Sequence, residues 1–325
     1  MSDLFSKLQK TIDSLQPIDE KTAMEILDVA DVDFPMVLGY ANKLRVKTQG
    51  EKIRICAIMN AKSGACSEDC AFCAQSAHNK TKAEVYPMRD GETIAKIHAE
   101  VSQDVHCFGV VTSGEGLDDK DIDVLAKAVK ENGCGAGWGA SLGIISDEQL
   151  LKLKNAGLTR YHHNIETAKS FYSEICTTHD WSLRFDMAKR VKNIGLSLCC
   201  GVILGVGESK KQRVEAAMEI NQIGSDVIPL NFLIAIEGTK LQDMPPMPPL
   251  DILKAVAMFR FVNPKADIKI AGGRLHLRQL QSMMFFAGAS SIISGSLLTT
   301  PNCSIENDMK MLADLELKVS GGDGI

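Results

Sequence analysis

The sequence contains no apolar run that approaches the ~20 residues needed to cross a bilayer. Its first residues, MSDLFSKLQKTIDSLQ, lack the charged, apolar and small-residue zones of a secretory signal peptide. A basic face is missing too, because the 36 Lys and Arg residues are interspersed with 41 Asp and Glu residues, for a net charge of −5. These absences argue against a membrane-spanning, secreted or nucleic-acid-binding protein. We therefore expect a cytoplasmic protein with no membrane or nucleic-acid partner.

What the chain does have is length, apolar content and thiols. With 325 residues, 45% of them hydrophobic, it can bury a large core in one big domain or two modest ones. Ten cysteines are many for a cytosolic chain, where metal binding or catalysis explains them better than disulfides do. They comprise a tight group, an adjacent pair and scattered single residues: Cys66, Cys70 and Cys73; Cys199 and Cys200; and Cys56, Cys107, Cys134, Cys176 and Cys303.

Hydrophobic periodicity divides the chain into a helical start and an alternating remainder. Residues 18–30 and 34–46 carry apolar residues at helical spacing, so residues 1–45 are predicted to form an N-terminal helical cap. From about residue 50, short apolar or β-branched runs alternate with amphipathic helical patterns. The predicted strands are residues 53–59, 106–112, 135–141, 160–165, 197–204, 226–233, 267–271 and 290–294.

Two of the intervening helices carry clear boundary signals. Ser146, with Gln149 three residues later, predicts a capping box, and Gly157 predicts the end of that helix. Ser182 is predicted to open the next helix, which should end at Gly195. Such signals support alternating strands and helices.

Eight strands that alternate with helices predict parallel βαβ units closed into an α/β (β/α)8 TIM-type barrel. We expect this barrel over residues 46–318, with a C-terminal tail at 319–325. An open, doubly wound sheet is the competing arrangement. In a barrel, the chemistry sits in the loops after the carboxyl ends of the strands.

The loop after the first predicted strand is the most unusual segment. It reads NAKSGACSEDCAFCAQSAHNKT and places Cys66, Cys70 and Cys73 in a Cys-x-x-x-Cys-x-x-Cys spacing. Three thiolates on one short loop can ligate three irons of a 4Fe-4S cluster and leave the fourth iron open. Structural zinc needs four protein ligands, and His78 is the only other candidate within reach.

This loop, with Phe72 just before its last cysteine, resembles that of the radical S-adenosylmethionine (SAM) superfamily. The resemblance implies that the open iron binds SAM, and that the reduced cluster cleaves SAM to methionine and a 5′-deoxyadenosyl radical. Such chemistry belongs to the cofactors, while the protein positions them and excludes water.

Later segments resemble the biotin synthases over about residues 45–318. They include YHHNIETAKSFYSEICTTHDWSLR, LCCGVILGVGES, IPLNFLIAIEGTKL, IAGGR and GSLLTT. The resemblance implies insertion of sulfur into dethiobiotin to form biotin. It also implies reduced flavodoxin or ferredoxin as the electron donor, and a homodimer.

The resemblance also assigns residues to the substrate. Asn164 and Asn231 match asparagines that bind the ureido ring of dethiobiotin, since an amide offers both a donor and an acceptor. Each could instead satisfy buried backbone groups at a strand end. His162 stands where the family more usually has another asparagine, so it is a less secure substrate contact.

A second set of residues matches positions that contact SAM in the superfamily: Phe72, Ser113, Glu166, Arg184 and Gly205. Glu166 is expected at the ribose hydroxyls and Arg184 at the SAM carboxylate, where a planar bidentate donor suits a planar anion. Gly205 would permit close approach of the backbone to adenosine. A solvated charge at Arg184 and an ordinary turn at Gly205 are the alternatives.

Biotin synthases hold a second, auxiliary iron–sulfur cluster that gives up a sulfur atom, and here the match is partial. Cys107 and Cys199 fit the family pattern, but Gly139 replaces a cysteine and Lys269 replaces an arginine. Alternation along a strand places Cys56 at the depth of Cys107, so we expect Cys56, Cys107 and Cys199 to hold this cluster with Lys269 nearby.

Several alternatives remain open at this second site. Cys56 could be an ordinary small core residue. Cys200 should point to the opposite face from Cys199, although a bulge would overturn this. A ligand gap could be filled by sulfide or by Cys134. For the whole chain, the alternative functions are another radical SAM enzyme, such as a hydrogenase-cofactor or pyrrolysine-pathway maturase, and a non-enzymatic iron–sulfur or zinc scaffold.

Overall fold

The computed structural model of the protein describes residues 2–133, 135–295 and 297–320. Its strands are β1 (Ile53–Lys62), β2 (Cys107–Thr112), β3 (Gly137–Ser141), β4 (Arg160–His162), β5 (Ser197–Cys199), β6 (Val202–Leu204), β7 (Val227–Phe232), β8 (Asp267–Ile270), β9 (Ser291–Ile293) and β10 (Val319–Ser320). Cys134 and residues 321–325 of the expected tail lie outside the described residues.

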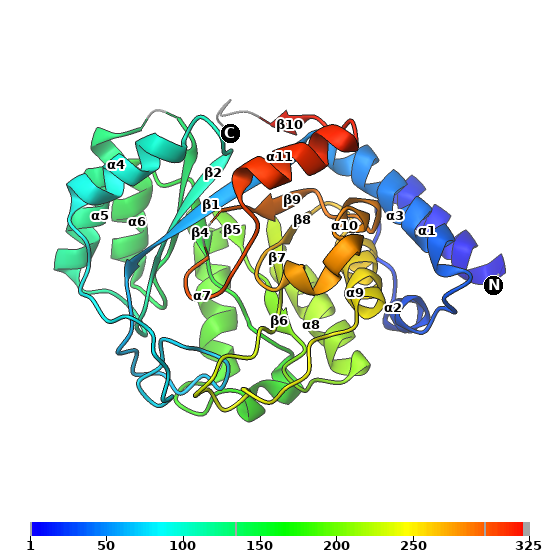
Figure 1. The fold of residues 1–325 in the computed structure, drawn as a ribbon, viewed down its shortest axis with the longest axis horizontal. Coiled ribbons are helices and arrows are strands. Elements are labelled where there is room, and N and C mark those ends of the chain that lie inside the picture. The colour runs from blue at the N-terminus through cyan, green and yellow to red at the C-terminus, as the bar shows by residue number, and fades with distance from the viewer. Residues whose placement is uncertain (1, 134, 296, 321–325) are drawn as a thin grey trace.

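The strands form a closed parallel barrel (Figure 1). They follow the order β1-β2-β3-β4-β5-β7-β8-β9, and β9 pairs with β1 to close the ring. Every strand pairing is parallel, as βαβ connections require. The barrel prediction is therefore confirmed, and the open sheet is excluded.

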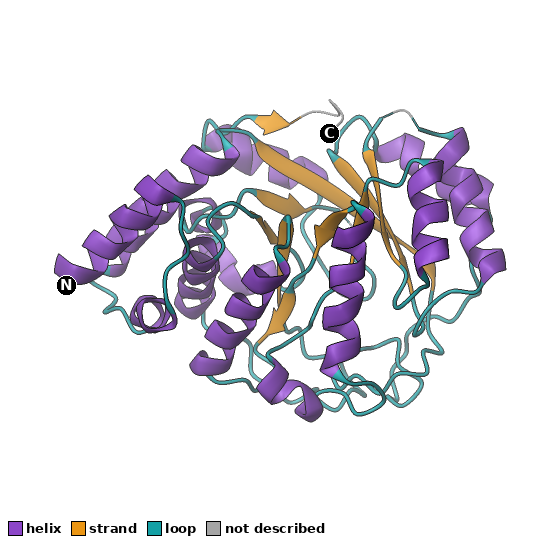
Figure 2. Ribbon diagram, turned by 180° about the vertical axis from the view of Figure 1, so that it is seen from behind, coloured by secondary structure: helices purple, strands orange, loops and turns teal. Residues whose placement is uncertain are grey.

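Helices cover the outside of the barrel, as Figures 1 and 2 show. The helices are α1 (Ser2–Ser14), α2 (Glu20–Leu27), α3 (Phe34–Gln49), α4 (Gly91–Val101), α5 (Asp119–Glu131), α6 (Asp147–Ala156), α7 (Trp181–Ile194), α8 (Lys210–Ile223), α9 (Pro249–Val262), α10 (Met283–Phe286) and α11 (Ile305–Asp314), with 3-10 turns η1 (Lys169–Glu174) and η2 (Arg274–Leu280). No helix in the described ranges is long and apolar enough to span a membrane.

The fifth predicted strand is interrupted in the structure. Residues 197–204 form β5 and β6, separated by Cys200 and Gly201. The backbone of Gly201 lies so close to the carbonyl and ring of Pro229 that no side chain would fit there. The single strand expected over 197–204 is therefore wrong at its centre, because the neighbouring strand β7 crowds it.

The helix signals were right at one position and wrong at another. Ser146 and Gln149 form the predicted capping box, and Gly157 ends α6 in the left-handed conformation. Helix α7 does end before Gly195, but it begins at Trp181 with Asp180 as its N-cap, so Ser182 lies inside its first turn. Trp181 is held there because its indole N–H donates to the Thr167 carbonyl at 3.1 Å.

The N-terminal helices pack on one side of the barrel. Helices α2 and α3 contact α9, whose residues 252–262 are all buried. A helix that is buried on every face needs a second layer outside it, and α2 and α3 provide that layer. At the other end of the described chain, Val319 pairs with Ile53, so β10 extends the sheet beside β1.

Candidate active site

Two adjoining cavities occupy the barrel interior and its mouth. The deeper one measures about 250 Å³ and is lined by Cys56, Cys107, Cys199, His162 and Lys269. The outer one measures about 350 Å³ and is lined by Phe72 and Cys73 from the cysteine loop. Both cavities share five polar lining residues, which are Thr112, Ser141, Asn164, Glu166 and Asn231. Cys73 of the cysteine loop and the three deeper cysteines therefore face adjoining cavities with a shared polar lining.

The cysteine loop is held in shape by its own hydrogen bonds. The Cys66 N–H donates to the Gln75 carbonyl at 3.0 Å, and the Cys73 N–H donates to the Cys70 carbonyl at 3.1 Å. The Asn79 amide donates to the carbonyls of both Cys70 and Cys73, at 3.1 and 2.8 Å. All three thiols are free, and those of Cys66 and Cys70 are buried. This donor set fits an iron–sulfur cluster with three protein ligands.

Glu166 and Arg184 lie together at the rim between the cavities. Arg184 Nη1 donates to the Asn164 carbonyl at 3.0 Å and lies 3.4 Å from Glu166 Oε1. Burial raises the pKa of Glu166, although Arg184 opposes this shift. Glu166 also has a φ of 66°, a strained conformation for a residue other than glycine, of the kind found at functional sites.

The other two residues assigned to SAM are engaged elsewhere. The Ser113 hydroxyl is buried and donates to the Gly64 carbonyl at 2.8 Å, which ties the end of β2 to the cysteine loop. The Gly205 N–H donates to the carboxylate of Glu208, and its φ of 85° requires glycine. Neither residue lines either cavity.

Both asparagines use part of their amides on the backbone. The Asn231 amide donates to the Val202 carbonyl at 3.1 Å, and its oxygen accepts the Gly272 N–H at 3.0 Å. The Asn164 oxygen accepts the Gly201 N–H at 3.0 Å. Each amide has two N–H groups and two lone pairs, so each keeps capacity for a ligand.

The three thiols predicted for the auxiliary cluster converge on the deeper cavity. Cys56 and Cys107 are register partners in β1 and β2, and their side chains share a hydrogen bond. This bond lowers the pKa of Cys56 well below its usual range, with help from Lys269 and against the effect of burial. Cys199 lines the same cavity and Cys200 does not, as strand alternation predicted.

Arg160 is a residue that the sequence reasoning missed. Burial lowers the pKa of Arg160, but the neighbouring Cys107 and Cys56 raise it above its usual value. Cys56, Cys199 and Cys107 raise the pKa of Lys269 in the same way. Arg160 Nη1 is buried without a hydrogen-bond partner. Two buried cations thus surround three thiols, which suits an anionic group. The available signal was a charged residue at the start of the strand predicted over residues 160–165.

His162 fills the space left by missing side chains. A Cβ added to Gly139 would lie 2.7 Å from His162 Nε2, and one added to Gly109 would lie 3.1 Å from His162 Cε1. Nε2 is buried with no partner, and burial lowers the pKa of the ring well below its usual range. A neutral imidazole therefore occupies the region where the family pattern has a cysteine side chain.

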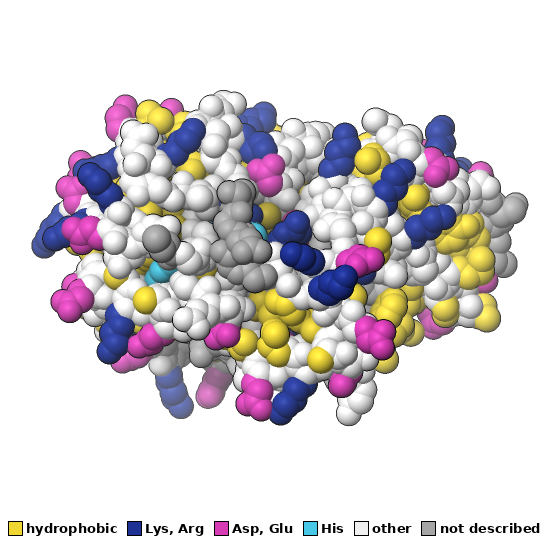
Figure 3. Space-filling model, turned by 90° about the horizontal axis from the view of Figure 1, so that it is seen from above, with side chains coloured by type: hydrophobic (Ala, Val, Ile, Leu, Met, Phe, Trp, Pro, Cys, Tyr) yellow, Lys and Arg dark blue, Asp and Glu magenta, His cyan; other side chains and the backbone are white. Residues whose placement is uncertain are grey.

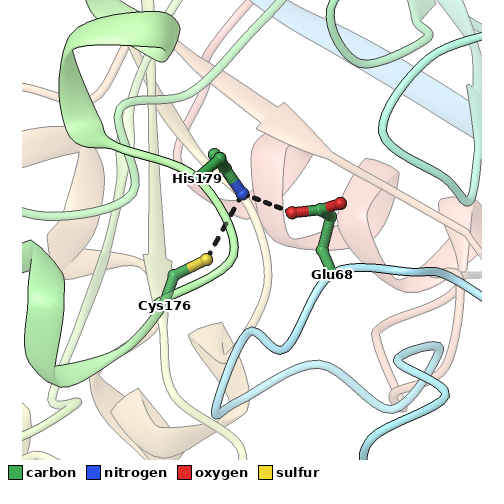
Figure 4. Close-up of side chains that lie close together, drawn as sticks. All are labelled: Glu68, Cys176 and His179. Atoms are coloured by element: carbon green, nitrogen blue, oxygen red, sulfur yellow. Dashed lines mark hydrogen bonds and ion pairs between the residues drawn. The ribbon is translucent and has the colours of Figure 1, made fainter.

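A second cluster of metal-ligating side chains was also missed. Glu68, on the cysteine loop, lies together with Cys176 and His179, as Figure 4 shows. His179 continues toward the rim, since its Nε2 lies 2.8 Å from the Tyr172 hydroxyl and 3.0 Å from Arg184 Nε. The Cys-x-x-His spacing of 176–179 was the only signal in the sequence.

Comparison with known proteins agrees with this geometry. Residues 61–220 match the Radical SAM superfamily, and residues 229–318 match the Biotin and Thiamin Synthesis associated domain. The chain is similar to the biotin synthase of Endomicrobium trichonymphae, at 43% identity over 92% of this chain and 94% of that protein. It is also similar to the biotin synthase of Geobacter sulfurreducens, at 42% identity over 94% and 95% of the two chains.

Solved structures show the same fold at lower identity. The structure of methylornithine synthase superposes with a TM-score of 0.82 at 18% identity and covers 97% of both chains. A maturase of the FeFe-hydrogenase gives a TM-score of 0.80, also at 18% identity, over 96% of this chain and 74% of that one. These solved structures share the fold at low identity, whereas the biotin synthases above share sequence similarity over nearly the whole length. The chain therefore belongs to the biotin synthase family of radical SAM enzymes.

Proposed function

We propose that this chain inserts sulfur into dethiobiotin to form biotin, with Cys66, Cys70 and Cys73 holding the SAM-cleaving cluster. The observation that carries the proposal is that Cys73 of the cysteine loop lines one cavity, that Cys56, Cys107 and Cys199 line the adjoining one, and that Asn164, Glu166 and Asn231 line both. A substrate bound against this shared lining would lie between the cysteine loop and the three cysteines of the deeper cavity. Family membership supports this reading.

The bound clusters would supply the electron that cleaves SAM and the sulfur atom that enters the product. The chain's own residues would bind and orient the two small molecules. Arg184 would hold the SAM carboxylate through its remaining N–H groups, and Glu166 would accept from the ribose hydroxyls. Phe72, at the edge of the outer cavity, would cover the adenosyl group, with Ser113 and Gly205 shaping the loops around it.

Asn164 and Asn231 would bind the ureido ring of dethiobiotin with the donors and acceptors that the backbone leaves free. His162, deeper in the barrel, would contact the same molecule or the auxiliary site, because its Nε2 has no protein partner. An unsatisfied buried nitrogen costs about 1–3 kcal/mol, so a ligand that bonds to it gains affinity.

Cys56, Cys107 and Cys199 would hold the auxiliary cluster. Lys269 has no free electron pair while protonated, so it would donate hydrogen bonds to the cluster and would not ligate iron. Arg160, which the sequence reasoning did not include, would serve the same electrostatic purpose from β4. Reduced flavodoxin or ferredoxin as electron donor, a homodimer and a cytoplasmic location complete the proposal.

Two measurements test this function. A biotin-requiring strain that carries the gene should grow on dethiobiotin. The protein reconstituted anaerobically should hold clearly more iron per chain than one 4Fe-4S cluster contains. Failure of both would indicate another radical SAM reaction.

Cysteine variants test the two thiol groups separately. Replacing Cys66, Cys70 and Cys73 by Ala should abolish 5′-deoxyadenosine formation and leave the auxiliary iron in place. Cys56→Ala should lower auxiliary iron and biotin yield, with Cys200→Ala as the matched control, since both side chains are buried. Loss of iron in the Cys200 variant alone would show that the ligand set is wrong.

A further inference from the structure

The Glu68, Cys176 and His179 cluster of Figure 4 extends to a fourth ligand atom on the cysteine loop. Cys176 Sγ lies 3.4 Å from His179 Nδ1, and Glu68 Oε2 lies 2.5 Å from the same nitrogen. Cys70 Sγ lies 3.9 Å from Cys176 Sγ. Cys70 therefore contacts the edge of the cluster through Cys176, while the ligand atoms of Glu68, Cys176 and His179 all lie within 4.8 Å of one another.

These spacings approach those of a tetrahedral zinc site. Zinc binds sulfur at about 2.3 Å and nitrogen or oxygen at about 2.0–2.2 Å, so two ligating sulfurs stand about 3.8 Å apart and sulfur and nitrogen about 3.5 Å apart. The Cys70–Cys176 and Cys176–His179 separations are already 3.9 and 3.4 Å. Glu68 would have to withdraw from His179 by about 1 Å to exchange its hydrogen bond for a metal bond, and Cys70 would have to move toward the other three ligands.

The surrounding structure fixes these ligands in place. The Ala71 N–H donates to the Ile175 carbonyl at 2.8 Å, and the Thr177 N–H donates to Asp69 Oδ1 at 2.8 Å, so the two ligand-bearing segments are clamped together. The side chains of His179 and Glu68 are only 5% and 11% exposed. A cation here would be shielded from water on most sides.

His179 also has the outer partner that a metal-bound imidazole needs. With Nδ1 on a cation, the ring proton resides on Nε2, which lies 2.8 Å from the Tyr172 oxygen and can donate to it. Arg184 Nε then keeps its bond of 2.8 Å to the same oxygen and gives up the bond of 3.0 Å that it donates to His179 Nε2. Binding releases a proton, because the thiols and the imidazole must all be deprotonated to ligate.

We propose that, before the SAM-cleaving cluster is assembled, Cys176, His179 and Glu68 bind a divalent thiophilic cation of the zinc type, and that Cys70 moves in as its fourth ligand. Cys70 then belongs to either the cation or the cluster, and the cation must leave before the cluster forms. The site would keep the Cys70 thiol from oxidation in the cluster-free chain and make cluster assembly sensitive to zinc. The competition between the cation and the cluster rests on the proposed function, in which Cys70 is a cluster ligand. The cation site itself does not depend on that function.

Cobalt binding tests the site without relying on enzyme activity. The full-length chain with Cys66→Ala and Cys73→Ala cannot form the SAM-cleaving cluster but keeps all four proposed ligands. Titrated anaerobically with Co²⁺ under reducing conditions, it should develop thiolate-to-cobalt absorbance and the visible bands of tetrahedral cobalt. Adding Cys176→Ala or His179→Gln should remove one equivalent of bound Co²⁺.

Cys303→Ala in the same background is the matched control, since this free thiol is partly buried and bonds to Gln281 instead. It should leave the cobalt spectrum unchanged. Melting curves of the metal-free variants identify any that fail to fold, and His179→Gln serves where Cys176→Ala does not fold. Cobalt spectra that are the same with and without Cys176 would overturn the proposal and place the cation at Cys56, Cys107 and Cys199.

The competition for Cys70 has its own measurement. One equivalent of Zn²⁺ added to the metal-free wild-type chain should slow the appearance of 4Fe-4S absorbance during reconstitution, and Cys176→Ser should remove this delay. Equal delays in both chains would refute the competition. Biotin formation by wild-type protein reconstituted without zinc tests the proposed function separately, so the two ideas can fail independently.

Discussion

The packing of His162 against Gly139 makes a sharp prediction about the deeper cavity. Gly139→Ala would place a Cβ 2.7 Å from His162 Nε2, closer than non-bonded atoms approach. Overpacking of this kind costs about 1–3 kcal/mol. The melting temperature should fall by about 2–6 °C, at roughly 2 °C per kcal/mol for a chain of this size.

The assay is a double-mutant cycle read by thermal unfolding of the cluster-free protein. If the destabilisation arises from contact with the imidazole, Gly139→Ala should hardly lower the free energy of unfolding in the His162→Ala background. The coupling free energy between the two substitutions should then be about 1–3 kcal/mol. Gly133→Ala is the control, because a Cβ there meets nothing within 4 Å. If Gly139→Ala lowers the stability equally in both backgrounds, the contact with His162 is refuted as the cause, and the destabilisation arises within strand β3.

Three further predictions concern ligand binding and pH. Asn231→Ala should weaken dethiobiotin binding roughly ten- to a hundredfold while SAM binding persists; equal losses of both would indicate misfolding. Arg184→Lys keeps the charge but loses the guanidinium fork, so SAM affinity measured by calorimetry should fall more than dethiobiotin affinity. Burial raises the pKa of Glu219 to about 7, so the folded state holds this proton more tightly than the unfolded state. Stability should then fall as pH rises from about 4.5 to 7, and Glu219→Gln should reduce that loss in denaturant titrations.

The sequence by itself determined the features that depend on neighbours along the chain. Strand and helix alternation follows from local hydrophobic period, and the eight barrel strands lie where that period placed them, apart from the break at Gly201. The spacing of Cys66, Cys70 and Cys73 is local in the same sense, so their shared loop was predictable. Alternation of side chains also explains why Cys199 faces the cavity and Cys200 does not.

Only the tertiary structure decided which distant residues meet. Cys70 and Cys176 are 106 positions apart, and their contact depends on how two loops at the barrel mouth are clamped. The burial of Arg160 beside Cys56 and Cys107, and the fit of His162 over Gly139, likewise require closure of the barrel. A sequence pattern fixes the face of a strand but not the neighbour across it, because that neighbour is set by register and packing over the whole sheet.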